Sequence, residues 1–569
     1  MFYAFALAYG MIALRLTYLQ FWNAKQYEAF GDKLRNRKLN LVAQRGTIYD
    51  RMGRELAINV RASSVYAHPR AVEDQGGVSV QLASLMKCDP AFLAKKLNLD
   101  KKFVWLERGL GDDVAERVEE AGLKGIGVQH EQKRVYPSRS LAAQILGFTG
   151  IDGEGLEGVE KEYDRYLHGR NGFVVAEVDA DGRIIPETRR ATVKPLDGKD
   201  LVLTIDAYIQ HVTEEALRDA FERSGAVGAS AVVLDPKTGE ILALANMPIF
   251  DPNNRKGSKP DAFRNRAITD PYEPGSTLKS ITACAALNEG VIRPGQVFTH
   301  CSGVTTVGKR RIRCVLHRPY LSGHQSVDLK RMISVSCNIG AATLGLRLGP
   351  DRLYKYAKAF GLLDVTDVGL KGEQTAWLDI PSKWAQIKSA NVAFGQGIAM
   401  TPLQLACAYG AIANKGVLMR PTVIKEIRNR DGTVFRSWTP QVVRRVVSEK
   451  VAEQVTKALA DCVTEGTGKN AAIDGYSVGG KTGSAQKVRP GDGRYSGFIA
   501  SFVGMVPTTN PRLVILVVVD DPKGSHWGAT WAAPAFKEIG RKAMWYLRTP
   551  RDAPEEQPRI RMAKRLGAV

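Results

Sequence analysis

The segment Glu273-Pro-Gly-Ser-Thr-Leu-Lys-Ser280 carries the strongest chemical signal in this chain of 569 residues. Its Pro-Gly pair predicts a turn, and the residues from Ser276 to Leu287 predict an apolar helix. Ser276 would therefore begin a helix, where the helix dipole favours developing negative charge. Lys279 follows three residues later on the same face. Because a serine nucleophile needs an adjacent base, a lysine with a lowered pKa would suit this position.

The S-x-x-K pattern alone is weak evidence, because it occurs at three serines, namely Ser84, Ser276 and Ser484. Ser84 falls within a predicted surface helix, and Ser484 is expected just past a strand. Only Ser276 opens an apolar helix directly after a turn. The sequence context therefore selects Ser276 as the candidate nucleophile.

Two further triplets complete a pattern, and each also occurs twice. S-x-N is found at Ser336-Cys337-Asn338 and Ser389-Ala390-Asn391, and K-T-G at Lys237-Thr238-Gly239 and Lys481-Thr482-Gly483. Lys237 belongs to a predicted hairpin turn, whereas Lys481 follows a strand-like stretch ending in two glycines, which permit close approach of a ligand. The ordered set Ser276, Ser336 and Lys481 remains.

Hydrophobic patterning predicts a mixed α/β fold around these motifs. Short runs of branched residues predict strands at 231–234 and 240–245, joined by the turn 235–239, and again at 498–503 and 513–519. Helical segments fill the interval, so we expect a sheet whose first and last strands meet. Upstream, a helical stretch at 78–97 is interrupted at Asp89-Pro90, and 201–205 predicts a short strand.

The N-terminus predicts one membrane anchor. Apart from tyrosines, residues 1–22 include only Arg15, Thr17 and Gln20 as polar side chains. A helix of that length spans about 33 Å, enough for a bilayer core of about 30 Å. A cleavable signal peptide would need a basic start and a small-residue cleavage site, and neither is clear here, since no Lys or Arg precedes Arg15. A buried core helix is the other alternative to a membrane anchor. The basic stretch 33–38 would by itself place the following chain in the cytoplasm; we expect instead a short cytoplasmic leader before the span, whose basic residues would reverse that orientation.

The chain carries 80 Lys and Arg against 59 Asp and Glu, a net charge of +21. This balance favours anionic partners such as nucleic acid, acidic lipids or an acidic polymer. Zinc-finger spacing, an RRM-type aromatic motif and a Walker loop are all absent from the sequence, and the basic residues are spread along the chain. A generally cationic surface is the better interpretation.

Seven cysteines do not make a disulfide scaffold, and the odd number leaves at least one thiol unpaired. Cys301 and Cys314 flank a strand-like stretch that could fold back as a hairpin. Three interpretations remain open: a disulfide between them, a metal site formed with His317 and His324, or two unpaired thiols.

S-x-x-K, S-x-N and K-T-G in this order are typical of penicillin-binding proteins and class A β-lactamases, although Cys337 stands where the usual triplet has Asp. From its anchor to about residue 545 the chain resembles class B penicillin-binding proteins, most of all the division-specific (septal) type, in which the middle triplet ends in Asn. The resemblance also rests on the segments 45–51, 134–137, 153–160, 264–270, 395–404 and 527–534.

The resemblance implies a serine-type D,D-transpeptidase that crosslinks peptidoglycan stem peptides during septal synthesis and is the target of β-lactams. Ser276 would attack the penultimate D-Ala, Lys279 would take the proton, and Ser336 would relay it to the leaving amine. Lys481 would supply positive potential. No cofactor and no metal ion is expected in this reaction.

The same resemblance implies the substrate-binding residues. In an extended segment Asn338 would point the same way as Ser336 and could hydrogen-bond the substrate amide. The hydroxyls of Thr482 and Ser484, on either side of Gly483, would hold the terminal carboxylate. The backbone N–H groups of Ser276 and Ser484 would form the oxyanion hole.

The expected architecture is a transmembrane anchor (1–23), an elongated α+β pedestal that binds partners (24–200) and a transpeptidase domain (201–550). This last domain would be penicillin-binding/β-lactamase-like, with helices around an antiparallel sheet. A basic flexible tail (551–569) follows. Expected partners are a SEDS-family glycan polymerase and other division proteins, together with stem peptides and β-lactams, but not nucleic acid. The chain is expected in the inner membrane with its catalytic domain in the periplasm.

Three alternative functions are weighed against this one. A β-lactamase or D-Ala carboxypeptidase needs a water-activating group and rarely has some 200 residues before its catalytic domain. A membrane-tethered β-lactam sensor or an inert scaffold is disfavoured by the intact pair of Ser276 and Lys279. A Ser-His-Asp hydrolase lacks its G-x-S-x-G signature here.

Overall fold

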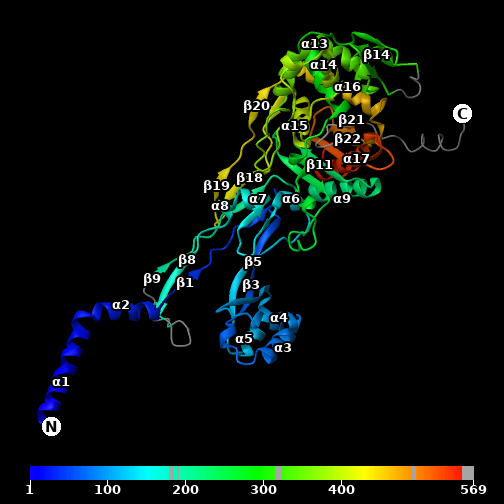
Figure 1. Ribbon diagram of the computed structural model, residues 1–569. Helices are drawn as coiled ribbons and strands as arrows, with labels where there is room; N and C mark the ends of the chain where they lie inside the picture. Colours follow the sequence, from blue (N-terminus) through cyan, green and yellow to red (C-terminus); the bar gives the residue numbers. More distant parts are fainter. Residues whose placement is uncertain (178–184, 186–187, 189–190, 316–321, 489–494, 554–569) are drawn as a thin grey trace. The chain divides into compact units, whose positions relative to one another are not determined.

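The computed structural model describes residues 1–177, 185, 188, 191–315, 322–488 and 495–553 (Figure 1). The chain divides into two compact units. The first comprises Met1–Gly46, Asn59–Lys133 and Arg165–Lys199, and the second Thr47–Ile58, Arg134–Asp164 and Asp200–Val569. The domain limits that the sequence suggests at residues 23, 200 and 550 stay a prediction.

The first unit begins with α1 (Phe2–Thr17), which continues as a π-helical turn over Tyr18–Trp22. Together these form a helix of 21 residues with a mean hydropathy of 1.4 and no buried residue in its apolar window. By length and composition this helix can cross a membrane, as the sequence predicted. The first unit also contains α2 (Ala24–Arg35), β1 (Asn36–Leu41), α3 (Gln75–Met86), α4 (Pro90–Leu97), β4 (Val104–Leu110), α5 (Asp112–Glu120), β8 (Gly172–Glu177) and β9 (Ala191–Val193), and α8 (Asp164–Leu167) lies at the boundary of this unit.

The predicted break at Asp89-Pro90 is confirmed, because Asp89 caps α4 and its carboxylate accepts the backbone N–H of Ala91. Helices α3, α4 and α5 pack on one hydrophobic cluster with β4 and the outer part of β3 (Glu55–Ala67), which also pairs with β5 (Ile126–Val135). Leu82, Leu93 and Leu106 are fully buried in this cluster.

The second unit is built on an antiparallel sheet of five strands in the order β12-β11-β23-β22-β21. The strands are β11 (Gly228–Leu234), β12 (Ile241–Met247), β21 (Gly479–Val488), β22 (Tyr495–Val506) and β23 (Leu513–Asp520). The predicted strands are therefore confirmed, and so is the meeting of early and late strands, since β11 pairs with β23.

Both faces of this sheet are covered, which explains its continuous runs of apolar residues. On one face, α9 (Ala207–Ser224) and α17 (Gly528–Tyr546) lie beside the strands (Figure 1). Leu217, Phe502 and Phe536 are buried in the hydrophobic cluster that these elements share. The alternate side chains of the strands point the other way, where α15 (Pro402–Ala413) approaches Leu234 so closely that a Cβ on Gly410 would lie 2.9 Å from its Cδ2.

The remaining elements of this unit surround the sheet, form two-stranded sheets or belong to a second sheet, of seven strands, which contains Ile48–Tyr49, Asp200–Leu203, Ile424–Arg428 and Val434–Ser437. They are β2 (Ile48–Tyr49), α6 (Ala143–Leu146), β6 (Phe148–Thr149), β7 (Gly155–Glu157), α7 (Gly158–Glu162), β10 (Asp200–Leu203), α10 (Arg266–Thr269), α11 (Lys279–Asn288), β13 (Thr299–Cys301), β14 (Val304–Val307), β15 (Arg310–Arg313), β16 (Gln325–Val327), α12 (Leu329–Ser334), α13 (Asn338–Ala359), α14 (Gln386–Ala393), β17 (Val417–Met419), β18 (Ile424–Arg428), β19 (Val434–Ser437), β20 (Val442–Arg445) and α16 (Glu449–Thr464). Residues 554–569 of the predicted tail lie outside the described residues.

Candidate active site

Ser276 lies in a 3₁₀ turn, Gly275–Leu278, that leads directly into α11. The turn begins at Gly275 with φ +56°, a left-handed conformation that favours glycine. Helix α15 holds this turn in place, because Tyr409 Oη on α15 donates a hydrogen bond of 2.7 Å to the carbonyl of Thr277. The predicted placement of Ser276 at a helix start after a turn is confirmed.

Three of the predicted site residues, Ser276, Ser336 and Asn338, surround the side-chain amine of a fourth, Lys279. Lys279 Nζ lies 3.1 Å from Ser276 Oγ and 3.1 Å from Ser336 Oγ. The carbonyl of Ser336 and Oδ1 of Asn338 each accept a hydrogen bond from this amine at 2.7 Å. Ser336 Oγ in turn donates to Ser276 Oγ at 2.9 Å. A candidate nucleophile, a base and a proton relay are thus in direct contact.

The environment of Lys279 favours its neutral form. Its side chain is fully buried, and this burial, together with the positive charge of Lys481, lowers the pKa of Lys279 to about 7. A substantial fraction of the amine is therefore unprotonated near neutral pH. A neutral amine beside Ser276 Oγ can accept the hydroxyl proton, whereas an ordinary lysine cannot.

The middle triplet reaches this cluster by a geometry that the sequence did not predict. Instead of an extended segment, Ser336 has φ +59° and lies in the turn between α12 and α13. Cys337 is the N-cap of α13, whose first residue is Asn338. The expectation that Ser336 and Asn338 lie in an extended segment, and point the same way for that reason, is wrong. A tight turn brings both to Lys279 instead.

The K-T-G triplet lies on β21, one of the two edge strands of the five-stranded sheet. Lys481, Thr482, Gly483 and Ser484 all belong to it, so the expectation that Ser484 lies past a strand is also wrong. The strand begins at the glycine pair Gly479-Gly480, which pairs with Met505 and Gly504 of β22 through the backbone alone. A side chain at position 483 has no room, because a Cβ there would lie 2.2 Å from Ser501 Oγ.

Lys481 is fully buried, and its burial lowers the pKa of the amine. Its Nζ lies 3.2 Å from Thr482 Oγ1 and 3.4 Å from Thr467 Oγ1. The hydroxyls of Thr467 and Thr482 are 3.0 Å apart. Sequence reasoning missed Thr467, because a single threonine outside the three triplets has no recognisable pattern. Ser484 Oγ accepts the backbone N–H of Gly528 at 3.1 Å, which leaves its own O–H able to donate.

These groups open into one cavity of about 860 Å³. Its lining includes Ser276 of S-x-x-K, Ser336 and Asn338 of S-x-N, Thr482 of K-T-G and the following Ser484. The hairpin of β14 and β15 contributes three cationic side chains to the same wall, namely Arg310, Arg311 and Arg313. A cavity that contains the half-buried hydroxyl of Ser276, with the buried amine of Lys279 behind it and a cationic wall, suits an acylating reaction on a substrate with negative charge.

The duplicate triplets do not form a second such cluster. Ser84 is an exposed residue of α3 in the first unit. Lys237 lies in the turn between β11 and β12 and donates to Asn510 Oδ1 at 2.7 Å. Ser389 is buried in α14, although Asn391 of the same triplet does line the cavity. This placement agrees with the selection of Ser276, Ser336 and Lys481 from their sequence context.

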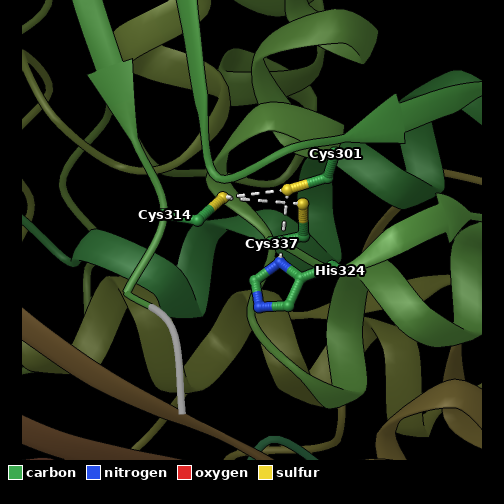
Figure 2. A group of neighbouring side chains, drawn as sticks. All are labelled: Cys301, Cys314, His324 and Cys337. Atoms are coloured by element: carbon green, nitrogen blue, oxygen red, sulfur yellow. Dashed lines mark hydrogen bonds between the residues drawn. The ribbon is translucent and has the colours of Figure 1, made fainter. Parts of the chain in front are cut away.

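Cys301 and Cys314 are close but not bonded, with sulfur atoms 3.6 Å apart. Their neighbours are His324, as the sequence suggested, and Cys337, which it did not associate with them (Figure 2). His317 lies outside the described residues.

Comparison with known proteins gives the family. Residues 229–541 match the model of the penicillin-binding protein transpeptidase domain, and residues 40–203 match the model of the penicillin-binding protein dimerisation domain. Among curated relatives, the stage V sporulation protein D of Bacillus subtilis is 36% identical over 95% of this chain and 85% of its own length. The peptidoglycan D,D-transpeptidase FtsI of Escherichia coli is 33% identical over 94% of this chain and 90% of its own.

The solved structures include penicillin-binding protein 3 of Mycobacterium tuberculosis complexed with aztreonam. It matches with a TM-score of 0.70 and 30% identity, over 91% of this chain and 100% of the other. The likeness thus extends across both matched domains and agrees with the motifs around Ser276. The chain belongs to the penicillin-binding proteins, and among them to class B, as its sequence predicted.

Proposed function

We propose that the protein is a peptidoglycan D,D-transpeptidase that crosslinks stem peptides through an acyl-enzyme on Ser276 and serves septal cell-wall synthesis. The observation that carries the proposal is the contact of 3.1 Å between Ser276 Oγ and the fully buried amine of Lys279. The relatives named peptidoglycan D,D-transpeptidase and the β-lactam complex of a similar structure support it. β-Lactams would acylate the same serine.

In the first half-reaction, Ser276 Oγ attacks the carbonyl carbon of the penultimate D-Ala. Lys279 Nζ takes the hydroxyl proton as the bond from Oγ to carbon forms. Ser336 Oγ contacts both Lys279 Nζ and Ser276 Oγ, so it can pass a proton to the nitrogen of the terminal D-Ala as the amide bond breaks. Free D-Ala leaves, and the stem peptide remains as an ester of Ser276.

Substrate positioning falls to the residues around this centre. Asn338 Nδ2 donates to the carbonyl of Arg313 at 2.9 Å, and its second N–H remains to bind a substrate carbonyl. Lys481 supplies positive potential behind Thr482, whose hydroxyl, with that of Ser484, would hold the terminal carboxylate. The backbone N–H groups of Ser276 and Ser484 would stabilise the oxyanion.

In the second half-reaction, the amine of a neighbouring stem peptide attacks the ester carbon. The new amide bond forms, the bond from carbon to Oγ breaks, and the amine's proton returns to Ser276 through Lys279 and Ser336. The cavity of about 860 Å³ is within the range of pockets that enclose drug-sized ligands. Its lining by residues of all three motifs supports one site for both steps.

The remaining predictions from the sequence are part of the same proposal. Residues 1–23 would anchor the chain in the inner membrane, 24–200 would form the partner-binding pedestal, 201–550 would carry the reaction in the periplasm, and 551–569 would be a tail. The match of residues 40–203 to the model of a dimerisation domain supports a separate domain before the transpeptidase domain. A SEDS-family glycan polymerase and other division proteins would be the membrane partners.

The test combines a fluorescent penicillin with peptide mapping and a crosslinking assay. We expect the adduct on the peptide that contains Ser276 and, with a stem pentapeptide donor and an amine acceptor, a crosslinked dimer with release of D-Ala. A hydrolysed tetrapeptide without dimer would assign a carboxypeptidase instead. An adduct without any turnover would assign a sensor.

A further inference from the structure

Four buried or half-buried side chains converge beside the middle triplet. Cys301 ends β13, Cys314 follows β15, His324 precedes β16, and Cys337 caps α13. Figure 2 shows the three sulfur atoms and the imidazole ring facing one point. Their ligand atoms all lie within 4.8 Å of one another. Four different segments of the chain thus bring three thiols and one imidazole nitrogen into a single cluster.

The spacing of these atoms fits the tetrahedral coordination of one metal ion. Cys301 Sγ lies 3.6 Å from Cys314 Sγ, and Cys314 Sγ lies 3.7 Å from Cys337 Sγ. His324 Nδ1 lies 3.5 Å from Cys301 Sγ. With bonds of about 2.3 Å to sulfur and about 2.05 Å to nitrogen, a tetrahedral zinc site has edges of about 3.8 Å between sulfurs and about 3.6 Å between sulfur and nitrogen. The observed distances are close to these edges.

A disulfide or hydrogen bonds between thiols would explain these contacts less well than a metal ion does. A disulfide has sulfur atoms about 2.05 Å apart, and it would use two of the three thiols and leave Cys337 and the imidazole unused. As hydrogen bonds, contacts between thiols are weak, because S–H is a poor donor and sulfur a poor acceptor. Cys301, His324 and Cys337 are fully buried. Three thiols and an imidazole gathered in the interior need a stronger common partner.

We propose that Cys301, Cys314, His324 and Cys337 bind one Zn²⁺ ion in a closed structural site. Three thiolates and one imidazole form a donor set typical of structural zinc. Backbone N–H groups at the start of α13 support the thiolates, since Ile339 N–H donates to Cys314 Sγ at 3.5 Å and Gly340 N–H to Cys337 Sγ at 3.3 Å. Each bound cysteine releases its thiol proton.

The ion would hold the middle triplet in place. Cys337 separates Ser336 from Asn338, so a bond to its sulfur restrains the left-handed turn that carries both side chains to Lys279. Cys314 directly follows Arg313, whose carbonyl accepts from Asn338 Nδ2. One ion would therefore tie the cationic hairpin of the cavity wall to the catalytic turn. Only this positioning role rests on the proposed function; the metal site itself does not.

The metal is tested first, on the full-length chain purified in detergent without a polyhistidine tag. Elemental analysis by mass spectrometry should find about one zinc per chain, and Cys301→Ser or His324→Gln should lose it. Cys88→Ser is the matched control, because Cys88 lies in the first unit, outside the cluster, and should keep the zinc. A chain without zinc, with iron or copper in its place, or with full zinc in both cluster variants overturns the proposal.

A second measurement on the unmodified sequence covers the case in which the cluster variants do not fold. Zinc replaced by cobalt(II) should give the intense visible bands and thiolate charge-transfer absorption of a tetrahedral thiolate site. Alkylation of the native protein should spare Cys301, Cys314 and Cys337 until a chelator is added. A mapped disulfide between Cys301 and Cys314 in the protein as isolated would refute the zinc site.

The positioning role is tested separately by removing zinc with a chelator and measuring acylation by a fluorescent penicillin. The rate at saturating penicillin should fall between about tenfold and a hundredfold, since misplacing a reacting group by about 1 Å can cost about a hundredfold. Added zinc, but not magnesium, should restore it. An unchanged rate in stripped protein overturns the positioning role, while the metal analysis still decides the site. Failure of the zinc-loaded protein to acylate would instead count against the proposed function.

Discussion

Ser336 Oγ donates a hydrogen bond of 2.9 Å to Ser276 Oγ, although the two serines are 60 residues apart in the chain. Both hydroxyls also lie 3.1 Å from the same amine, Lys279 Nζ. The nucleophile therefore has two polar neighbours, one able to take its proton and one able to pass a proton on. This triangle of atoms, more than any single motif, makes specific predictions about acylation.

Substitution of Ser276 by alanine should abolish covalent labelling by penicillin. The change removes only a hydroxyl from a turn whose backbone is held by Tyr409 and α15, so the fold should be retained. Labelling is measured by gel fluorescence and intact mass, and folding by circular dichroism. Ser84→Ala, at an exposed S-x-x-K serine of the first unit, should label as the unmodified chain does. Persistent labelling of Ser276→Ala, with the adduct on Ser484, would contradict the assignment.

Replacement of Lys279 by arginine should slow acylation by at least about a hundredfold, the lower range for loss of a general base. Arginine keeps the positive charge but does not deprotonate near neutrality. The measurement is the second-order rate of acylation by a fluorescent penicillin. Lys237→Arg provides the control, because that lysine of the duplicate K-T-G lies in a turn and contacts Asn510. A near-normal rate for Lys279→Arg would show that the amine acts only as a counter-charge.

The acylation rate should rise with pH through about 7, following the pKa that burial and Lys481 give Lys279. The reactive form is the neutral amine, so protonation below this pKa removes the base and slows the reaction. At pH 5, two units below a pKa of about 7, only about 1% of the amine would be neutral. Rates between pH 5 and 9 are measured with a β-lactam whose own charge is constant over that range. A profile that is flat across pH 7 would refute Lys279 as the base.

The sheet was predictable from the sequence because its strands are buried on both faces. Runs such as residues 513–519 are apolar at every position, and only burial on both sides accounts for that pattern. The selection of Ser276 was possible because a turn before an apolar helix is a local feature. Both predictions depend on neighbours in the sequence.

The predictions from the sequence were wrong where the local geometry depends on residues far away in the chain. Ser336 adopts a left-handed turn because α13 begins at Asn338 with Cys337 as its cap, and no local pattern distinguishes this from a strand. Ser484 lies within β21 because backbone pairing with β22 continues past the glycines. The sequence associated Cys301, Cys314 and His324 in one possible metal site, but it did not associate Cys337 with them, because that residue was read as part of the S-x-N triplet.

Thr467 should assist the groups behind the carboxylate site. Its hydroxyl lies 3.0 Å from Thr482 Oγ1 and 3.4 Å from Lys481 Nζ. Thr467→Ala should slow acylation by up to about tenfold, since one hydrogen bond contributes about 0.5–1.5 kcal/mol. Thr467→Ser keeps the hydroxyl and should retain most of the rate. Equal losses in the two variants, measured under the same conditions, would mean that the methyl group and its packing matter and the hydroxyl does not.

The apolar helix Phe2–Trp22 should matter for assembly and not for chemistry. The triangle of Ser276, Lys279 and Ser336 lies wholly in the second unit, so a chain without residues 1–23 should still bind penicillin. Arg15 is the one basic residue inside the helix, and a charge facing lipid costs a few kcal/mol, which favours a protein neighbour at that position. Arg15→Leu should therefore weaken co-purification with the proposed partner, a SEDS-family glycan polymerase, from detergent, while penicillin labelling stays unchanged. If the chain lacking 1–23 both binds the polymerase and restores division in depleted cells, the helix is only a tether and the partner surface must lie elsewhere.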